Sequence, residues 1–395
     1  MSAELASARK MEPGRSVEEL IAETERLSVE VFAPHADEID SSRRFPRENI
    51  DALGRSGLLG LLVPTAYGGV GGGIREMSQI LDRIGQSCAS TAMITLMHYC
   101  GTAVLVAKAS VPVKDALLPA IARGKHLTTL AFSEPGSGGH FYCPISQLST
   151  SGLDIMLSAR KSFVTSAGEA DSYVVSTRSA KAKTPTEIDL FFVDKEAGGL
   201  EVCGRFDGLG MGGNASAPLE LHSVHVDEEL RLGGESTGFE TMLQVVLPHF
   251  QIGSASVSLG MAEAAFQRAT AHLSSRKYQH LGGISMAEIP RAQFVVGEMA
   301  LEIRSARSYL GETIRRVVSG DGQAVLDVLG IKAQAAEACL SVVSNAMTVC
   351  GGTAYGRRGG LERIFRDAHA APVMAPSTDV LKEFLGKACL GLPLF

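Results

Sequence analysis

The chain has 395 residues, of which 45% are hydrophobic and 20% are charged, with a net charge of −6 and a pI near 6.0. These values are typical of a globular protein with a large core, and the acidic balance gives no reason to expect a nucleic-acid partner. The seven cysteines include no Cys-x-x-Cys pair. No uninterrupted apolar run reaches about 18 residues, so we expect a reduced, cytoplasmic protein without a membrane span.

Residues 1–126 are expected to be helical. Apolar residues recur at helical spacing in 17–36 and again in 50–59. The glycine-rich segment 61–73 follows a helical hairpin and not the strand that a dinucleotide fingerprint requires, so we do not interpret it as a phosphate site. The segment 84–109 is small and apolar nearly all round, which predicts a buried helix.

Residues 127–232 are expected to form strands. Alternation of apolar and polar residues in 188–193 and 219–226 predicts antiparallel pairing. His222 and His225 invite a metal-site interpretation. Positions i and i+3 of a strand point to opposite faces, and no third ligand is evident, so we predict no metal site.

Residues 233–395 are expected to be helical again, with long helices over 240–275, 289–319 and 324–348. The last helix is expected to stop at Gly351-Gly352. The order of elements predicts an α+β protein with three domains: an N-terminal helical domain (1–126), a central antiparallel β domain (127–232) and a C-terminal helical domain (233–395).

Two segments of the central domain carry the functional signal. Both 127–140 and 160–178 read as strands that break into Gly/Ser turns. Each strand ends where small hydroxyl residues adjoin an aromatic, at Phe132-Ser133 and at Phe163-Val-Thr-Ser166. A flat heteroaromatic cofactor needs such a wall of ring faces and donors, although ordinary strand ends produce the same pattern.

The motif Ser133-Glu-Pro-Gly-Ser-Gly138, followed by Phe163-Val-Thr-Ser-Ala-Gly168 and Ala170-Asp171, resembles the paired flavin-binding signatures of the acyl-CoA dehydrogenase superfamily. The resemblance covers essentially the whole chain and implies helical, β and helical domains, the last helices forming a four-helix bundle. It implies an oxidoreductase of class EC 1.3 that removes an α-proton from an acyl thioester and passes a β-hydride to flavin N5. The acyl group would be carried by CoA or by a carrier protein.

The resemblance implies FAD as the cofactor, with FMN left open because two glutamines of the family pattern fall on Pro290 and Thr348. In the family, some of the cofactor-binding residues meet the flavin ring of their own subunit, and others reach the diphosphate of the neighbouring subunit's flavin. We therefore expect a homodimer or homotetramer. The residues assigned to the cofactor are Phe132, Ser133, Phe163 and Thr165 at the ring, Arg276, Gly351 and Gly352 at the diphosphate, and Ser377.

The acyl thioester is assigned to a second set of residues by the same resemblance. His98 falls on the helix that lines the acyl pocket in the family, but a satisfied core histidine is the alternative. His140 replaces the Asp that ends the first signature. The full set is His98, Gly139, His140, Phe250 and Ala375.

The catalytic base of the family is missing from this chain. The usual Glu falls on Ala375, and the position used by a minority of relatives falls on Phe250. Because a carboxylate in a dry pocket suits removal of an α-proton, its absence makes this an atypical member. His249 and Asp379 are the candidate replacements.

Two other functions stay open. Relatives that carry out oxygen chemistry use a His near position 374, where this chain has Met374, so a flavin-dependent monooxygenase is the alternative enzyme. A catalytically silent homologue that binds flavin or acyl-CoA is the third hypothesis. The electrons are expected to pass to an acceptor protein or to oxygen.

Overall fold

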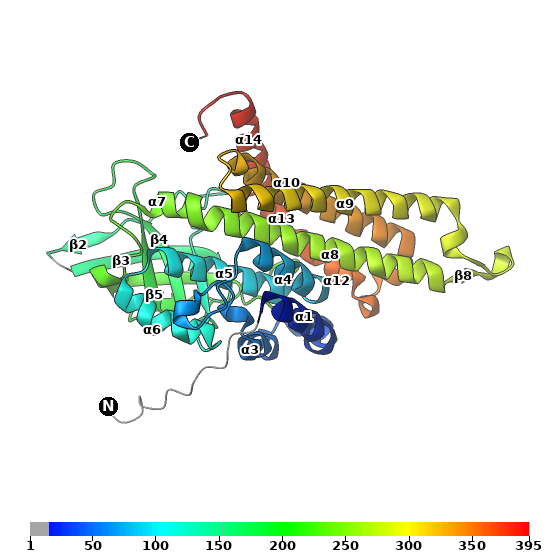
Figure 1. The fold of residues 1–395 in the computed structure, drawn as a ribbon, viewed down its shortest axis with the longest axis horizontal. Helices are drawn as coiled ribbons and strands as arrows, with labels where there is room; N and C mark the ends of the chain where they lie inside the picture. Colours follow the sequence, from blue (N-terminus) through cyan, green and yellow to red (C-terminus); the bar gives the residue numbers. More distant parts are fainter. Residues whose placement is uncertain (1–15, 153, 395) are drawn as a thin grey trace.

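The computed structural model describes residues 16–152 and 154–394. Strands gather at one end of an elongated molecule, and long C-terminal helices run toward the other end (Figure 1). Helices precede the strands and follow them along the chain, so the predicted α+β class is confirmed. Helices give way to strands between Ala122 and Thr128, and strands to helices between Val226 and Gly238, while the domain boundaries themselves stay predictions.

The N-terminal part is helical, as predicted. Ser16 caps the start of helix α1: its hydroxyl accepts a hydrogen bond from Glu19 N–H (3.2 Å), and its own N–H donates to Glu19 Oε2 (2.8 Å). A π-helical turn at Ser28–Phe32 joins α1 to α2, so the helical backbone continues to Ser42 before the left-handed Arg43 ends it. The helices are α1 (Val17–Leu27), α2 (Ala33–Ser42), α3 (Arg47–Ser56), α4 (Ile74–Ser87), α5 (Ala89–Lys108) and α6 (Val111–Ala122).

The segment 84–109 is two helices, so the prediction of one is wrong. Cys88 is extended (φ −147°, ψ 105°) and separates α4 from α5. Within the described part of the chain, α5 is the one helix long and apolar enough to cross a membrane. Because 89% of its most apolar 18-residue stretch is buried inside the protein, α5 is a core helix here.

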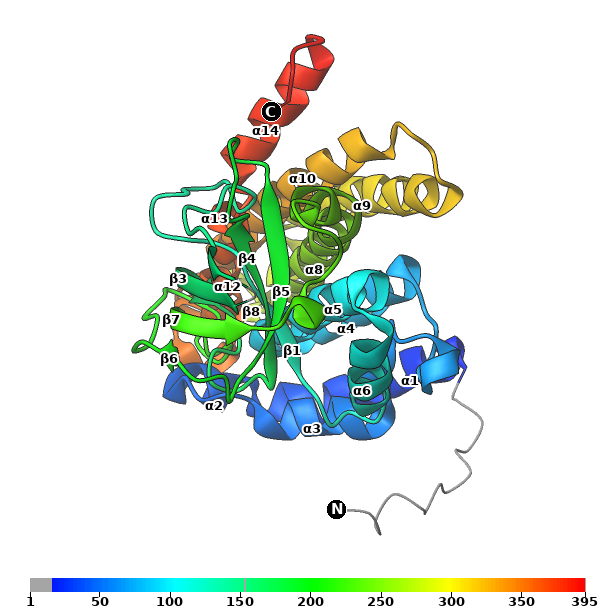
Figure 2. The ribbon, with the colours of Figure 1, turned by 90° about the vertical axis from the view of Figure 1, so that its left-hand side faces the viewer.

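The strands between residues 128 and 226 form two sheets, which lie toward the viewer in Figure 2. Most pairs are antiparallel, as predicted, but β1 runs parallel to β4, with Thr128 opposite Ser172. The chain crosses to the second sheet between β1 and β4, which lets β4 return in the same direction. The sheets are ordered β1-β4-β5 and β2-β3-β7-β6, from β1 (Thr128–Ala131), β2 (Ser149–Ser151), β3 (Asp154–Val164), β4 (Ser172–Arg178), β5 (Ile188–Asp194), β6 (Leu200–Val202) and β7 (Ala217–Val226).

His222 and His225 share the exposed face of β7, contrary to the prediction that they point to opposite faces. A β-bulge causes this, because Leu157 pairs with Val224 and Ala159 pairs with Leu221, which leaves one extra residue on β7. His222 lies 3.2 Å from Glu220 and His225 lies 3.4 Å from Asp154. No group of three metal-ligating side chains occurs in the described residues.

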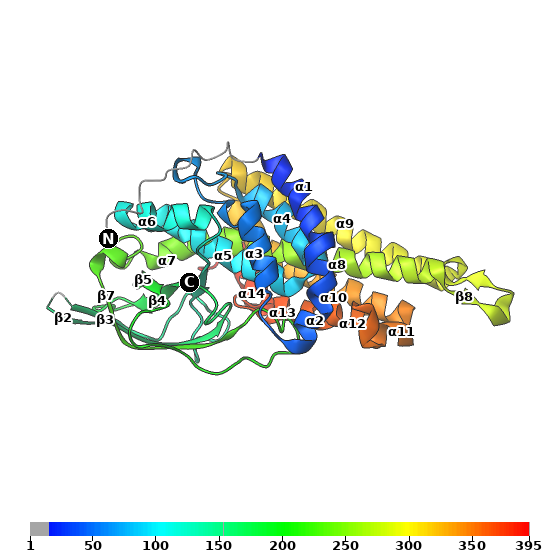
Figure 3. The same ribbon diagram turned by 90° about the horizontal axis from the view of Figure 1, so that it is seen from below.

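The C-terminal part is helical, as predicted, and its long helices end within two residues of the predicted positions; the one predicted from 240 is observed as α7, a π-helical segment at Met242–Val246 and α8. Helices α8, α9 and α10 run side by side along the molecule (Figures 1 and 3). A Cβ at Gly260 would collide with the Asp82 carbonyl oxygen, so this glycine lets α8 approach α4 closely. The elements are α7 (Gly238–Thr241), α8 (Leu247–Ser275), β8 (Lys277–Tyr278), β9 (Ile284–Ser285), α9 (Pro290–Ser319), α10 (Ala324–Cys350), α11 (Gly352–Tyr355), α12 (Leu361–Ala368), α13 (Ala370–Val373) and α14 (Thr378–Cys389).

Candidate functional site

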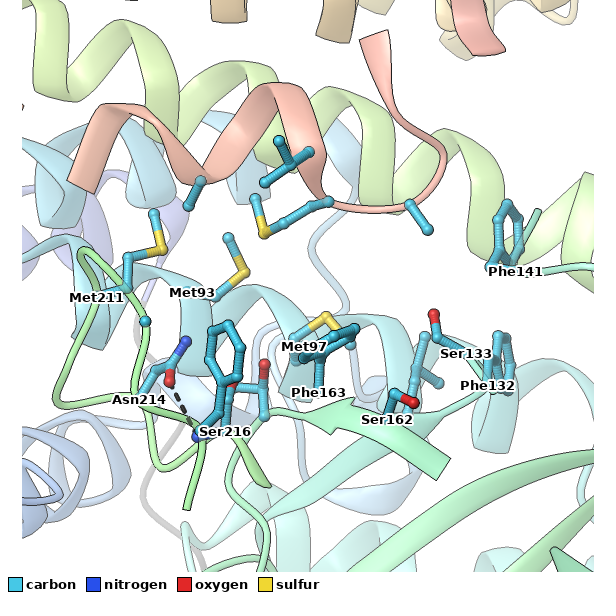
Figure 4. A pocket seen from close by; sticks show the side chains of 18 of the residues that line it. Met93, Met97, Phe132, Ser133, Phe141, Ser162, Phe163, Met211, Asn214 and Ser216 are labelled. Atoms are coloured by element: carbon cyan, nitrogen blue, oxygen red, sulfur yellow. Dashed lines mark hydrogen bonds between the residues drawn. The ribbon is translucent and has the colours of Figure 1, made fainter. Parts of the chain in front are cut away.

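A cavity of about 650 Å³ lies between the ends of the β strands and the helices. In Figure 4, Met93 and Met97 project into it from α5, and Phe163 rises from the end of β3. Helices α12 and α13 face them from the opposite side. The cavity thus has one wall built from the β domain and one from the C-terminal helices.

The β wall consists of Phe132-Ser133 at the end of β1 and Phe163–Thr165 at the end of β3. Ser162 N–H donates to the Ser133 carbonyl at 2.8 Å, which ties the two strand ends together. Phe163 has a positive φ of 52° and its side chain is 60% exposed. Such a backbone costs on the order of 1 kcal/mol for an L-residue. An exposed ring held at that cost on a cavity wall is typical of a ligand-binding surface.

A buried ion pair supports the β wall from behind. Lys161 is fully buried, and its Nζ lies 2.6 Å from Glu134 Oε1, 2.5 Å from the Ser176 carbonyl and 3.4 Å from the Phe132 carbonyl. Glu134 Oε2 also accepts the backbone N–H groups of Ile145 (2.7 Å) and Ser146 (2.8 Å). Burial opposes ionisation of Glu134, but the Lys161 ammonium and these hydrogen bonds lower its pKa.

The loop 206–216 closes one end of the cavity and is pinned to α12. A Cβ at Gly210 would collide with the Arg366 carbonyl, so only a glycine allows this approach. Met211 lines the cavity, and its N–H donates to Asp367 Oδ1 at 2.5 Å. Burial raises the pKa of Asp367 to about 6, although Arg363 lies beside it.

The helix wall consists of Val373 at the end of α13, Met374 and Ala375 directly after it, and Phe250 of α8. In Figure 4 it lies across the cavity from Phe163 and Ser133. Its side chains are apolar, and Ala375 stands between Met374 and Pro376 at the start of the loop into α14. A substrate chain entering here would contact carbon and sulfur on this side.

Three ionisable side chains, Glu134, Arg366 and His369, contribute to the lining of the cavity. Glu134 is bound to Lys161, and Arg366 lies 2.6 Å from Asp40. His369 Nδ1 lies 2.7 Å from the Phe365 carbonyl. Because a carbonyl only accepts, Nδ1 carries the proton and Nε2 keeps a lone pair. Over the described residues, therefore, no carboxylate lining the cavity is free of an ion pair.

Sequence models of three domains match this chain in order. The acyl-CoA dehydrogenase N-terminal domain matches residues 15–125, the middle domain 129–224 and the C-terminal domain 252–375. The chain belongs to the acyl-CoA dehydrogenase family. The members of this family are flavoprotein oxidoreductases, which confirms the predicted class of enzyme.

Curated relatives match over nearly their whole length. The chain is 29% identical to cyclohex-1-ene-1-carbonyl-CoA dehydrogenase of Geobacter metallireducens, over 91% of this chain and 94% of the relative. It is 26% identical to the short-chain specific acyl-CoA dehydrogenase of Clostridium acetobutylicum, over 88% of this chain and 91% of the relative. The structure of butyryl-CoA dehydrogenase from Megasphaera elsdenii superposes with a TM-score of 0.89 at 22% identity, covering 97% of this chain and 100% of that one, and so shows the shared fold.

Several residues assigned from the family pattern do meet at the cavity. Those that line it are Phe132, Ser133, Phe163, Thr165, Phe250 and Ala375. Gly139 and Ser377 are not among the lining residues but lie beside each other, since a Cβ on Gly139 would stand 3.0 Å from Ser377 Oγ. His140 lines a second, open cavity of about 420 Å³ beside Arg178. The loop 133–140 therefore separates the two cavities.

His98 does not line the cavity, although it was assigned to the substrate. It is fully buried, and its Nδ1 accepts the Thr128 N–H at 3.1 Å. Nε2 must then carry the proton and donate to the Leu59 carbonyl at 3.0 Å. Burial lowers the pKa of His98 to about 4. These contacts fit the alternative, a satisfied core histidine.

Neither candidate base lines the cavity. His249 Nδ1 donates to the Val245 carbonyl at 2.7 Å, and burial lowers the pKa of this histidine. Asp379 is exposed in the first turn of α14. The two positions stay proposals.

The residues assigned to the diphosphate stand away from the cavity of their own chain. Arg276 follows α8 directly and is exposed, and Figure 1 shows β8 at the end of α8 opposite α7. Gly351 and Gly352 are exposed at the end of α10, and a Cβ on either would meet nothing within 4 Å. One chain by itself does not bring them to Phe163 or Thr165.

Sequence reasoning missed Met93, Met97 and His369 as lining residues. The two methionines lie four residues apart on α5, a spacing that places both on one helix face. In a segment that is apolar all round, however, nothing in the sequence distinguishes the face toward a cavity from the face toward the core. His369 lies three residues after Arg366, which places both on one face of a helix, and the sequence offers no other sign that His369 lines a cavity.

Proposed function

We propose that this protein is a flavin-dependent oxidoreductase that acts on an acyl thioester carried by CoA or a carrier protein. The observation that carries the proposal is the pairing of an exposed aromatic ring on the β wall with an apolar helix wall, across one cavity of about 650 Å³. A ring face suits a flat cofactor, and the apolar wall suits an acyl chain. The relatives of matching length are named as dehydrogenases of acyl-CoA thioesters.

The residues of the β wall fit FAD. Phe163 offers a ring face that is 60% exposed, and Thr165 places a hydroxyl two residues further along the same wall. Ser133 adds a second hydroxyl on the neighbouring strand end. A bound flavin supplies a hydride acceptor at its N5. Phe163 would stack near the ring, Ser133 would meet the pyrimidine edge, and the Thr165 hydroxyl would donate to the N5 edge.

The diphosphate would be held across a subunit boundary. Arg276 brings an exposed guanidinium, and Gly351-Gly352 leave backbone open to close approach. Because these groups stand away from their own cavity, we propose a homodimer or homotetramer in which they complete the site of a neighbour. Exposed apolar side chains on α9, Phe294 at 59% and Leu301 at 67%, offer a surface for such association.

The acyl chain would lie among Met93, Met97 and Phe250, with its thioester toward Ala375 and Gly139. Removal of the α-proton needs a base, and no free carboxylate lines the cavity in the described part of the chain. His249 and Asp379 remain candidates from the sequence, and His369 adds a lone pair at Nε2 on the lining itself. The variants His249→Ala, Asp379→Asn and His369→Ala, compared by the rate of flavin reduction, separate the three.

Anaerobic mixing with a panel of acyl thioesters tests the proposal. A dehydrogenase is expected to show bleaching of the flavin absorbance, with formation of an α,β-unsaturated product. Oxygen uptake that depends on an added flavin reductase would instead favour the monooxygenase alternative. Tight flavin binding with neither reaction would leave a silent homologue, and the proposal would then be wrong. The oxidised state would be restored by an electron-acceptor protein or by oxygen.

A further inference from the structure

Lys332 is a fully buried lysine on α10. Its Nζ donates to three backbone carbonyls, those of Ala371 (2.9 Å), Met374 (2.9 Å) and Pro376 (2.8 Å). No carboxylate lies within 4 Å of this ammonium in the parts of the chain described. The charge is therefore compensated by peptide dipoles and not by a carboxylate.

The three carbonyls belong to a segment with little support of its own. Helix α13 has only four residues, and the chain then passes through the loop 374–377 before α14 begins. Carbonyls at the end of a helix lack internal partners, and buried ones need a donor. Lys332 provides that donor for three of them at once, from a long helix that runs behind the loop.

The carbonyls on both sides of position 375 are fixed in this way. Met374 and Ala375 line the cavity, so the bonds to Met374 and Pro376 set the direction in which the side chain at 375 leaves the backbone. Lys332 Nζ also lies 6.0 Å from the centre of the Phe250 ring, the other member of the helix wall. One side chain thus touches both parts of this wall.

The ammonium form suits the cage of carbonyls. Three acceptors take three N–H donors, which the protonated amine has and the neutral amine lacks. Burial lowers the pKa of Lys332 to about 7, whereas hydrogen bonds to the charged form oppose that effect. A side chain without N–H groups would leave three carbonyls unpaired inside the protein.

We propose that Lys332 is a positioning residue that holds the loop Met374–Pro376 and the Phe250 ring in place on the substrate side of the cavity. This inference rests on the proposed function, since it assigns the helix wall to the acyl thioester. Lys332 would not touch the reacting atoms. It would act through the backbone on either side of Ala375.

Hydrogen–deuterium exchange of the flavin-loaded protein tests the support of the loop without reference to catalysis. In Lys332→Met, a side chain of similar length without donors, exchange across 371–381 is expected to rise about tenfold or more while peptides covering β1 and β3 stay unchanged. Lys332→Gln keeps two N–H donors, so its exchange across 371–381 is expected to lie between that of the unsubstituted protein and that of Lys332→Met. This variant serves as the test if the Met variant does not fold. Lys382→Met, at an exposed lysine of α14 that pairs with Glu337, is the control and is expected to change nothing.

Flavin bleaching by acyl thioesters gives the second measurement. Lys332→Met is expected to keep its flavin, to lower the limiting rate about tenfold and to raise the half-saturating thioester concentration. Unchanged exchange across 371–381, an equal rise in the β domain, or an unchanged rate despite faster exchange would each overturn the inference. If exchange behaves as expected while none of the acyl thioesters bleaches the flavin of the unsubstituted protein, Lys332 still supports the loop. In that case the proposed function is the part that fails.

Discussion

The two walls of the cavity are each supported by a fully buried lysine, but the two lysines are compensated differently. Behind the β wall, Lys161 faces the carboxylate of Glu134 and bonds to the Phe132 and Ser176 carbonyls. Behind the helix wall, Lys332 donates to three carbonyls and has no carboxylate partner among the described residues. A buried pair leaves an unpaired charge when one member is removed, whereas a carbonyl cage leaves only unpaired dipoles.

This contrast indicates how the protein divides its tasks. The β wall joins β1, β3 and β4 through one ion pair, so its two strand ends move as a unit. The helix wall is a short loop that depends on one side chain from another helix. We expect the cofactor side to be the more rigid part and the substrate side to be the part in which small changes alter the rate.

Removing the charge behind the β wall is expected to have the largest effect. Lys161→Met leaves Glu134 buried without its partner, which costs about 3–5 kcal/mol, and the variant should lose flavin as well as stability. Chemical denaturation and the absorbance of the bound flavin measure the two effects. Lys195→Met, which breaks the exposed pair with Asp171, is the matched control and should cost less than about 1 kcal/mol. Equal losses in both variants would contradict the contrast between the walls.

A change at the front of the β wall should affect reaction more than binding. Thr165→Val removes the hydroxyl proposed to donate to the N5 edge, where charge develops during hydride arrival, and should cost about 3 kcal/mol in the transition state. Single-turnover flavin reduction measures the rate, and flavin content measures the binding. Thr165→Ser keeps the hydroxyl and should retain most of the rate. If valine and serine behave alike, the hydroxyl has no such role.

A carboxylate placed on the helix wall sharpens the comparison from the other side. Ala375→Glu should raise the rate of α,β-dehydrogenation about 100-fold, because it places a base among the apolar side chains of Met374 and Phe250. Stopped-flow bleaching with a panel of thioesters measures this gain. In a Lys332→Met background the same substitution should bring little gain, since the loop would no longer aim the new side chain. A folded, flavin-loaded Ala375→Glu protein no faster than its parent would mean that position 375 does not face the reacting carbon.

The smallest expected effect concerns a third buried titratable group, His98, which is also compensated by backbone alone. Its folded pKa of about 4 lies below the ordinary 6.5, so the folded protein binds fewer protons than the unfolded chain between these pH values. Its contribution to stability is therefore present above pH 6.5 and is lost as the pH falls toward 4, by about 2 kcal/mol between pH 7 and 4.5. Denaturant titrations over this range should show a weaker pH dependence in His98→Gln. The exposed His222→Gln should leave the dependence unchanged, and a result in the opposite order would contradict the assignment.

The sequence alone determined the order of elements and the β wall. Periodicity places both ends of α9 and α10, and the C-terminal end of α8, within two residues of the observed positions, because the 3.6-residue repeat is local information. The two signatures also bring Phe132, Ser133, Phe163 and Thr165 together correctly, since each marks the end of a strand. These features depend on residues that are neighbours in the chain.

Only the tertiary structure decided what lies between distant segments. The carbonyls that accept hydrogen bonds from Lys332 lie 39 to 44 residues further along the chain. The residues around a lysine in an apolar helix do not predict such partners. The bulge that brings His222 and His225 to one face arises from pairing with β3, and His98 is satisfied by Leu59 and Thr128 from other elements. In each case a buried polar group or an unpaired strand residue had to find its partner across the fold. Which partner is available depends on how distant segments pack together, and a single sequence does not show that packing.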